Sequence, residues 1–293
     1  MLTPSTTTPI ALRTNRLHGT ATAPVIEALV PAASHSTPRP SGEMVPSRPG
    51  ALRSAIDTYA LAAQQISDTL ALLSDTLKPV RHVVHAGDKI YEAGDPFVKL
   101  HVLNSGLVKL VSTASDGRQQ ISGFKFRGDW LGLEGIDGSI HACDAVALDT
   151  GEVWSFRYDA LIAAATRQPA LLLALHRAMS GTIVRDRDSL MSVCTLPSDA
   201  RVADFLHYWA ESLARRGLRT DYITLRLTRA EIGNYLGMTL ETVSRVLGRL
   251  ANHGLLAFAD PGRRELAIPD VSALADYVQR SLAPTAVLPA TLQ

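Results

Sequence analysis

The stretch RAEIGNYLGMTLETVSRVLGRL, Arg229–Leu250, specifies the fold of the C-terminal part of this 293-residue chain. It is preceded by Thr228, and Glu231 follows that threonine three residues later. This spacing is a capping box, in which the two side chains satisfy free backbone N–H groups at the start of a helix. A helix is therefore predicted from Arg229 to about Leu236.

A second helix is predicted directly after the first. Gly237 breaks the first helix, and Thr239 is a favourable N-cap for the next one. That second helix ends near His253, because Gly254 can adopt the left-handed conformation of a C′ residue. Two helices joined by a three-residue turn that contains glycine are typical of a helix-turn-helix.

The second helix groups a carboxylate, a hydroxyl and a guanidinium close to its start. Its apolar residues share one face by the i, i+4, i+7 rule: Val243, Leu247 and Leu250. Glu241, Ser244 and Arg245 therefore point outward within the first two turns. In a helix-turn-helix these positions meet base edges in the major groove, where Arg pairs with guanine, Glu accepts from cytosine and Ser bonds either base. The alternative is a surface ion pair between Glu241 and Arg245, worth roughly a few tenths of a kcal/mol.

The distribution of charge supports the nucleic-acid interpretation. The whole chain has a net charge of +1, but residues 215–264 hold nine Arg, no Lys and four acidic residues, a local net charge of +5. Such a basic segment attracts the phosphate backbone of DNA. The last part of it is predicted to form a small hairpin from LLAFA and ELAIP. The residues expected to contact DNA phosphates are Thr228, Thr239, Arg249, Arg263 and Arg264.

The middle of the chain has the pattern of a small antiparallel β-domain. Between Val80 and Phe156, short β-branched or alternating runs are separated by Gly next to Asp or Ser, and these residues supply the turns of hairpins. The clearest hairpin turns at Asp116–Gly117. With the helix-rich C-terminal part, this pattern makes the fold class α+β.

A long helix is predicted between Pro169 and Pro197, because no proline interrupts that segment. Leu171, Leu173 and Leu175 are expected to dock its start onto the β-domain. A heptad seam runs along the helix and requires a partner helix. The seam residues are Leu172, His176, Met179, Ile183, Asp186, Leu190 and Val193.

The acidic seam residue leaves two alternatives open. In a symmetric dimer Asp186 would face its own symmetry mate, so the two carboxylates would repel each other and weaken the dimer. The other possibility is that Arg185 or Arg187 of the partner helix neutralises it.

On these motifs the chain resembles the CRP/FNR family of bacterial transcription regulators, most specifically in LTRAEIGNYLGMTLETVSRVLGRL. GRQQISGFKFRGDWLG, MSGTIVRDRDSL and the E-x-x-S-R pattern of Glu241, Ser244 and Arg245 are similar to its FNR branch. The resemblance covers Val80 to about Asp270. It implies a homodimer that binds a palindrome with TTGAT-like half-sites, controls anaerobic, redox or respiratory genes, and uses no catalytic residues.

The resemblance also implies a domain order and a further partner. The hairpin surface at Asp116, Gly117 and Arg118 would be available to RNA polymerase. Residues 1–50 are rich in Thr, Ser, Pro and Ala, which indicates a disordered tail, with an organellar transit peptide as the alternative. The expected domains are the tail (1–50), a cyclic-nucleotide-binding-like β-roll with a leading helix (51–168), a dimerisation helix (169–197), a winged helix-turn-helix (198–282) and a flexible tail (283–293).

The sensing chemistries of the family do not fit this sequence. Residues 1–79 contain no cysteine, and Trp154 occupies the position of the cluster ligand in the barrel, so four thiolates for an iron–sulfur cluster are missing. For cyclic nucleotides, Glu134 lacks the preceding Gly and no Arg follows it in the same stretch. We expect no cofactor and no metal. Cys194 is either a redox-sensitive thiol or a small buried hydrophobe.

The remaining expectations concern the class of protein and its location in the cell. No nucleophile–base pair, paired carboxylates or phosphate loop occurs, so we do not expect an enzyme. Two isolated cysteines and the lack of a long apolar run predict a cytoplasmic protein that does not cross a membrane. The alternative to a DNA-binding regulator is an effector-binding module whose C-terminal domain docks a protein partner.

Overall fold

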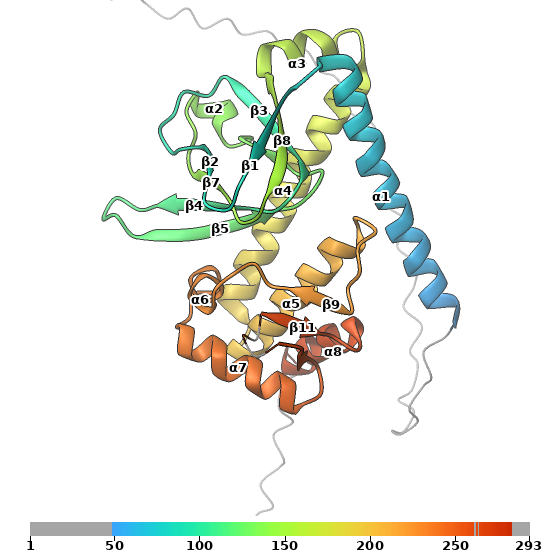
Figure 1. Ribbon diagram of the computed structural model, residues 1–293, viewed down its shortest axis with the longest axis vertical. Coiled ribbons are helices and arrows are strands. Elements are labelled where there is room, and N and C mark those ends of the chain that lie inside the picture. Colours follow the sequence, from blue (N-terminus) through green and yellow to red (C-terminus); the bar gives the residue numbers. More distant parts are fainter. Residues whose placement is uncertain (1–48, 261, 263, 283–293) are drawn as a thin grey trace, which may run out of the picture. The chain divides into compact units, whose positions relative to one another are not determined.

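The computed structural model describes residues 49–260, 262 and 264–282. The predicted tails 1–50 and 283–293 therefore lie outside the described residues, apart from residues 49 and 50. The described part has the predicted α+β fold, with a β-roll, a long helix and a helix-rich C-terminal domain (Figure 1). None of its helices is long and apolar enough to cross a membrane.

The roll consists of two four-stranded antiparallel sheets, in the strand orders β1-β8-β3-β6 and β2-β7-β4-β5. Two short helices belong to it, α2 (Gly135–Gly138) and α3 (Tyr158–Ala165). The predicted hairpin is the β4–β5 pair, whose turn contains Gly117 at a φ of 82°. The strands are β1 Val80–Val84, β2 Lys89–Tyr91, β3 Lys99–Ser105, β4 Val108–Thr113, β5 Gln119–Lys125, β6 Trp130–Leu131, β7 Asp144–Ala147 and β8 Gly151–Arg157.

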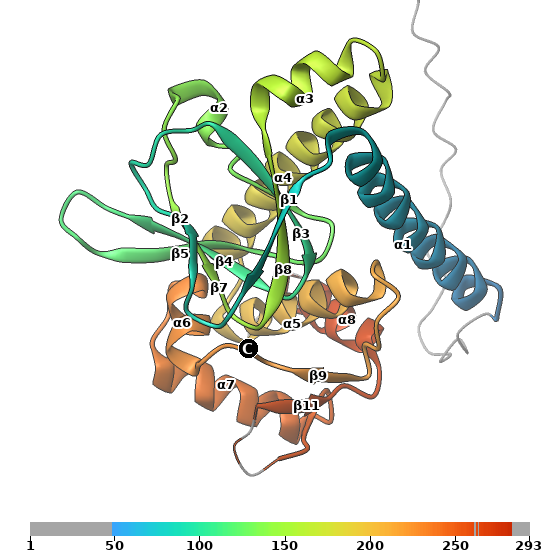
Figure 2. The same ribbon diagram turned by 45° about the horizontal axis from the view of Figure 1, so that its top comes forward.

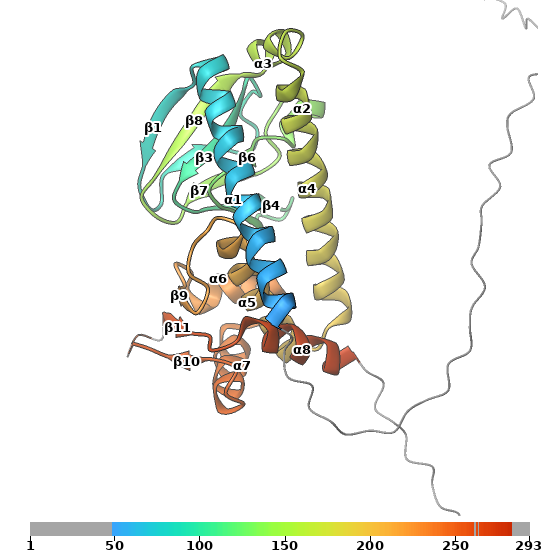
Figure 3. The same ribbon diagram turned by 90° about the vertical axis from the view of Figure 1, so that its right-hand side faces the viewer.

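Helix α1 (Pro49–Leu77) leads into the roll and begins two residues before the predicted start. Leu70 and Leu73 are buried in the core of the roll. Ile66 lies so close to Gly128 that a Cβ at this glycine would be 2.5 Å from Ile66 Cγ2, which explains why only glycine fits there. Helix α1 contacts α3 and the long helix α4, and in Figure 3 it lies on the side of the molecule that faces the viewer.

Helix α4 (Pro169–Thr195) starts with proline at its first position and ends two residues before the predicted end. Leu171 and Leu175 are buried in the core of the roll, as predicted. The prediction for Leu173 is wrong, because its side chain is 50% exposed. It lies about 160° around the helix axis from each of the two buried leucines, since successive residues turn by roughly 100°.

The C-terminal domain is the predicted winged helix-turn-helix, with one additional strand. The predicted hairpin is the β10–β11 pair, and the unpredicted strand β9 pairs with β11 to make a three-stranded sheet. Leu225 N also donates to the carbonyl of Arg264 at 2.8 Å, which extends the pairing. The elements are α5 Ser198–Ala214, β9 Tyr222–Thr224, α6 Arg229–Leu236, α7 Leu240–Asn252, β10 Ala257–Phe258, β11 Glu265–Ala267 and α8 Val271–Leu282.

The roll and the C-terminal domain share one hydrophobic core. Phe124 and Phe126, at the end of β5, pack edge-to-face against Trp209 of α5, with ring centroids 5.3 and 5.1 Å away. Edge-to-face aromatic pairs add roughly 0.5–1.5 kcal/mol beyond the burial of their area. The helix-turn-helix is therefore built onto the roll through buried aromatic residues.

Candidate nucleic-acid interface

The helix-turn-helix has the predicted caps at both of its helices. Glu231 N donates to Thr228 Oγ1 at 3.1 Å, and Thr228 N donates back to the Glu231 carboxylate at 2.8 Å, so the capping box is complete. Gly237 ends α6 in the left-handed conformation, with a φ of 65°. Thr239 then caps α7 by accepting from Thr242 N at 3.2 Å. These local bonds fix the start of α7, which follows α6 after a short turn (Figure 2).

Helix α7 separates a buried face from an exposed one, as the sequence predicts. Its buried residues are Val243, Leu247 and Leu250, together with Val246, which the spacing rule did not include. Glu241, Ser244 and Arg245 are all exposed within the first two turns. The structure therefore brings the three predicted base-reading side chains together on one open surface.

The Glu241 carboxyl interacts mainly with the start of its own helix. Its own backbone N–H at the helix N-terminus, and then the Thr239 side chain, lower the pKa of this carboxyl, and Arg245 is the weakest of the causes. An N-terminal carboxylate is stabilised by the free N–H groups of the first turn. Glu241 is therefore an ionised acceptor at neutral pH, and Arg245 is available for another partner.

The five predicted phosphate-contacting residues fall into different environments. Thr228 and Thr239 are exposed but already serve as helix caps. Arg264 is exposed, and Arg263 lies outside the described residues. Arg249 differs from the expectation, because its Nε donates to Asp199 Oδ2 at 2.7 Å and so ties α7 to α5. Nothing in the local sequence pairs two residues that are 50 positions apart.

Two hydrogen bonds join Arg118 to Asp116 within the predicted polymerase-contacting turn. Arg118 Nε donates to Asp116 Oδ2 at 2.7 Å, and Arg118 N donates to Asp116 Oδ1 at 3.1 Å. Both side chains are exposed at the tip of the β4–β5 hairpin. The backbone N–H and the Nε–H of Arg118 hold the pKa of the Asp116 carboxyl below its usual range.

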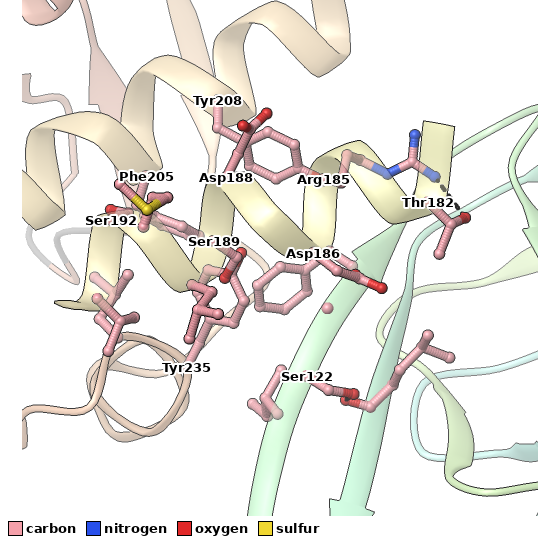
Figure 4. Close-up of a pocket in the computed structure, with 18 of the residues that line it drawn as sticks. Ser122, Thr182, Arg185, Asp186, Asp188, Ser189, Ser192, Phe205, Tyr208 and Tyr235 are labelled. Atoms are coloured by element: carbon pink, nitrogen blue, oxygen red, sulfur yellow. Dashed lines mark hydrogen bonds between the residues drawn. The ribbon is translucent and has the colours of Figure 1, made fainter. Parts of the chain in front are cut away.

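A cavity of about 1130 Å³ lies between the roll, α4 and the C-terminal domain. Figure 4 shows Ser122 of β5, Asp186 and Ser189 of α4, and Tyr235 of α6 around it. Glu134, Cys143 and Lys125 also line it. The stretch around Glu134 contains no Arg, but β5 brings a cation to this part of the roll in Lys125, whose buried Nζ lies 3.4 Å from Thr182 Oγ1 of α4.

The two cysteines lie in different surroundings, Cys143 in the roll and Cys194 on α4. Cys143 is buried beside Glu134, and burial raises the pKa of its thiol to about 12. Trp154 is buried, with its Nε1 donating to Glu152 Oε1 at 2.7 Å. Over the described residues, no three His, Cys, Asp or Glu side chains are arranged to hold a metal ion. Cys194 is exposed rather than a small buried hydrophobe.

The exposed apolar face of α4 differs in part from the predicted seam. Met179 and Val193 are half-buried against their own chain, whereas the other five seam residues are exposed. Three further exposed apolar residues of this helix lie next to seam positions but are not part of the predicted seam: Leu173, Val184 and Met191. The free apolar surface is therefore wider than the heptad seam and displaced toward these three residues.

Comparison with known proteins agrees with this arrangement. Residues 81–168 match the cyclic nucleotide-binding domain family, and residues 200–277 match the Crp-like helix-turn-helix domain family. The fumarate and nitrate reduction regulatory protein of Escherichia coli K12 is 33% identical over 190 residues, which are 65% of this chain and 74% of that protein. This chain belongs to the CRP/FNR family. It is an FNR-like transcription regulator with a helix-turn-helix DNA-binding domain.

Two other relatives support the same assignment. Electron transport regulator A of Shewanella oneidensis is 32% identical over 198 residues, which are 68% of this chain and 77% of that protein. The solved structure of FixK2 from Bradyrhizobium japonicum has a TM-score of 0.60 and 28% identity, and covers 68% of this chain and 96% of its own. The CRP/FNR regulators are not enzymes, and their C-terminal domain binds DNA rather than serving only to dock a protein.

Proposed function

We propose that this CRP/FNR regulator binds, as a homodimer, a palindrome with TTGAT-like half-sites and controls anaerobic, redox or respiratory genes. The observation that carries the proposal is the exposed group of Glu241, Ser244 and Arg245 at the capped start of α7. Arg can donate two hydrogen bonds to guanine, and an ionised Glu can accept one from cytosine. The names of two relatives, a fumarate and nitrate reduction regulator and an electron transport regulator, support the choice of genes.

The exposed face of α4 supports the homodimer. Ile183 is 53% exposed and Leu190 is 63% exposed, and they are accompanied by the neighbouring apolar residues of the same helix. A long helix with a continuous free apolar face is stabilised by packing against a second helix. Two copies of this chain, paired through α4, would present two α7 helices to the two halves of a palindrome.

RNA polymerase is the further partner that we propose, at the tip of the β4–β5 hairpin. Asp116, Gly117 and Arg118 project there as an exposed turn with one acid and one base. Its support is this exposure and the family resemblance. A chain changed at this turn should still bind the palindrome but should lose activated transcription in a purified system.

A binding titration tests the main proposal. Labelled duplexes would carry the TTGAT palindrome, the same palindrome with one half-site scrambled, or both half-sites scrambled. We expect tight binding of two chains to the intact palindrome and a loss of at least roughly a thousandfold for the fully scrambled duplex at physiological salt. Equal affinity for all three duplexes would reject sequence-specific recognition, and binding of one chain per palindrome would reject the homodimer.

A further inference from the structure

Arg201 lies at a junction of three helices near the end of α4. Its Nε donates to the carbonyl of Leu196, the C-cap residue of α4, at 3.2 Å. Its Nη1 donates to the carbonyl of Leu236, the last residue of α6, at 2.9 Å. The last carbonyls of a helix have no partner within the helix, and a guanidinium is a favourable one. One side chain of α5 therefore binds the ends of two other helices.

The same junction brings α4 against the turn of the helix-turn-helix. A Cβ placed on Gly237 would be 3.8 Å from Val193 Cγ1 and 3.9 Å from Arg201 Nη1, so the side chains of both residues lie against this turn. Only Met238 and Thr239 separate Gly237 from the start of α7. A displacement of the turn relative to α4 would therefore displace the reading helix as well.

A second attachment holds α6 from the side of the roll. Asn234 Oδ1 accepts from Ile121 N at 2.6 Å, and Asn234 Nδ2 donates to the carbonyl of Gln119 at 2.8 Å. Asn234 thus binds the free backbone groups of β5 as a neighbouring strand would. Close by, Lys109 Nζ of β4 lies 2.6 Å from Glu231 Oε1 of α6.

We infer that Arg201, with Asn234 as a second attachment of α6, is a positioning residue that sets which spacing between two half-sites the regulator accepts. This inference rests on the proposed binding of a palindrome by a dimer. In such a dimer the paired α4 helices form the fixed frame, and each α7 is held to that frame through the junction. Arg201 contributes no base contact in this scheme, and base choice within a half-site stays with Glu241, Ser244 and Arg245.

The number of base pairs between the two half-sites is a sensitive measure of how the two α7 helices are placed relative to each other. Each base pair added between the half-sites turns the second one by roughly 35° about the DNA axis, because B-DNA has about 10–10.5 base pairs per turn. A rigidly held pair of reading helices matches one spacing and rejects its neighbours. If α6 is released from α4, each helix-turn-helix can rotate to follow the displaced half-site.

The experiment compares the wild-type chain, Arg201→Lys and Asn234→Asp on palindromes whose central spacer is shortened or lengthened by one or two base pairs. Lysine has a single ammonium group, which cannot replace the two-armed guanidinium at both carbonyls. Aspartate keeps the acceptor for Ile121 but loses the donor to Gln119. The matched control is Arg219→Lys, since Arg219 forms its two-armed pair with Asp221 inside its own loop.

In the wild-type chain and in Arg219→Lys we expect one strongly preferred spacer. In Arg201→Lys, the ratio of affinities between the preferred spacer and its neighbours should fall roughly tenfold, about the worth of one charge-assisted hydrogen bond. Discrimination between bases within a half-site should stay unchanged, which a general loss of folding would not produce. Thermal unfolding of each variant provides the check, and Asn234→Asp carries the test if Arg201→Lys does not fold.

Two failures can be told apart. If the wild-type chain shows no preference for a palindrome of any spacing, the proposed function fails and this inference falls with it. If the wild-type chain prefers one spacer and the folded variants keep the same ratio, only the inference about Arg201 and Asn234 is overturned.

Discussion

Asp199 and Arg249 form a two-armed ion pair that joins the first turn of α5 to the last turn of α7, with Nε–Oδ2 at 2.7 Å and Nη2–Oδ1 at 2.5 Å. Arg249 therefore helps to hold the reading helix in the domain. Its contact with a DNA phosphate stays a prediction. Helix α7 is thus fixed at both ends, by the Thr239 cap and by Asp199.

We expect this pair to give a pH-dependent contribution to stability. The Arg249 guanidinium lowers the pKa of the Asp199 carboxyl, so the stabilisation is present above the unfolded pKa of about 3.9 and is lost as pH falls through the lower folded pKa. Because the Arg249 side chain is 46% exposed, solvent screening limits the coupling to about 0.5–1 kcal/mol. A double-mutant cycle of Asp199→Ala and Arg249→Ala, measured by urea unfolding at pH 7 and pH 3, checks this. A coupling energy that is equal at both pH values would contradict it.

Base reading by Glu241 and Arg245 predicts position-specific losses. Glu241→Ala and Arg245→Ala should each cost roughly 1–3 kcal/mol at one base pair of the half-site and remove discrimination there. Titrations against single-base variants of the palindrome measure both effects. The control variant is Asn252→Ala, because Asn252 is exposed at the far end of α7. If Glu241→Ala weakens binding to every duplex equally, this residue does not read a base.

Arg264 is expected to behave as a phosphate contact. It is exposed next to β11, and within the described part of the chain it has no ion pair like the one that occupies Arg249. Arg264→Ala should weaken binding to all sequences alike and reduce the slope of log affinity against log salt by about one unit. Arg249→Ala provides the comparison and should change the slope less, since this arginine already pairs with Asp199. An equal reduction of the slope in both variants would show that Arg249 leaves Asp199 to bind DNA.

The attachment of the C-terminal domain to the roll depends on a buried ion pair. Arg216 Nη2 lies 2.9 Å from Asp129 Oδ2, and their side chains are only 7% and 15% exposed. Asp129→Ala would leave the guanidinium buried and uncompensated, so it should destabilise the fold by roughly 3–5 kcal/mol. Asp159→Ala, which removes the exposed pair with Arg157, should cost far less, because solvent screens this pair. Urea unfolding compares the two, and similar losses would disprove the buried contribution.

Asp186 offers a test of the dimer interface. Its carboxylate is exposed on α4, and it acts electrostatically on the buried ammonium of Lys125 in its own chain. Lys125 is buried inside its own chain, whereas the two Asp186 carboxylates would face each other across the interface and repel, so we expect Asp186→Leu to tighten the dimer. Sedimentation equilibrium of wild type and variant at two salt concentrations measures the change. An unchanged or weaker dimer would favour neutralisation by Arg185 or Arg187 of the partner helix.

Interactions between residues close in the sequence determine many elements of this protein, and those elements could be predicted from the sequence alone. The capping box of Thr228 and Glu231, the left-handed Gly237, and the inward face of α7 all follow from residues within one or two helical turns. The hairpin at Asp116–Gly117 and the long helix after Pro169 are of the same kind. Hydrogen bonds and steric limits act between near neighbours here, so the spacing of residue types was sufficient.

The ion pairs and hydrogen bonds between residues far apart in the sequence became visible only in the tertiary structure. Arg249 pairs with Asp199, Arg216 with Asp129, and Arg201 with the ends of two helices, although no sequence period relates these partners. The heptad spacing likewise showed which residues of α4 share a face, but not that Met179 and Val193 would be covered by their own chain. Burial and ion pairing depend on how the packed elements approach each other, and that approach is set by the shared core rather than by any one segment.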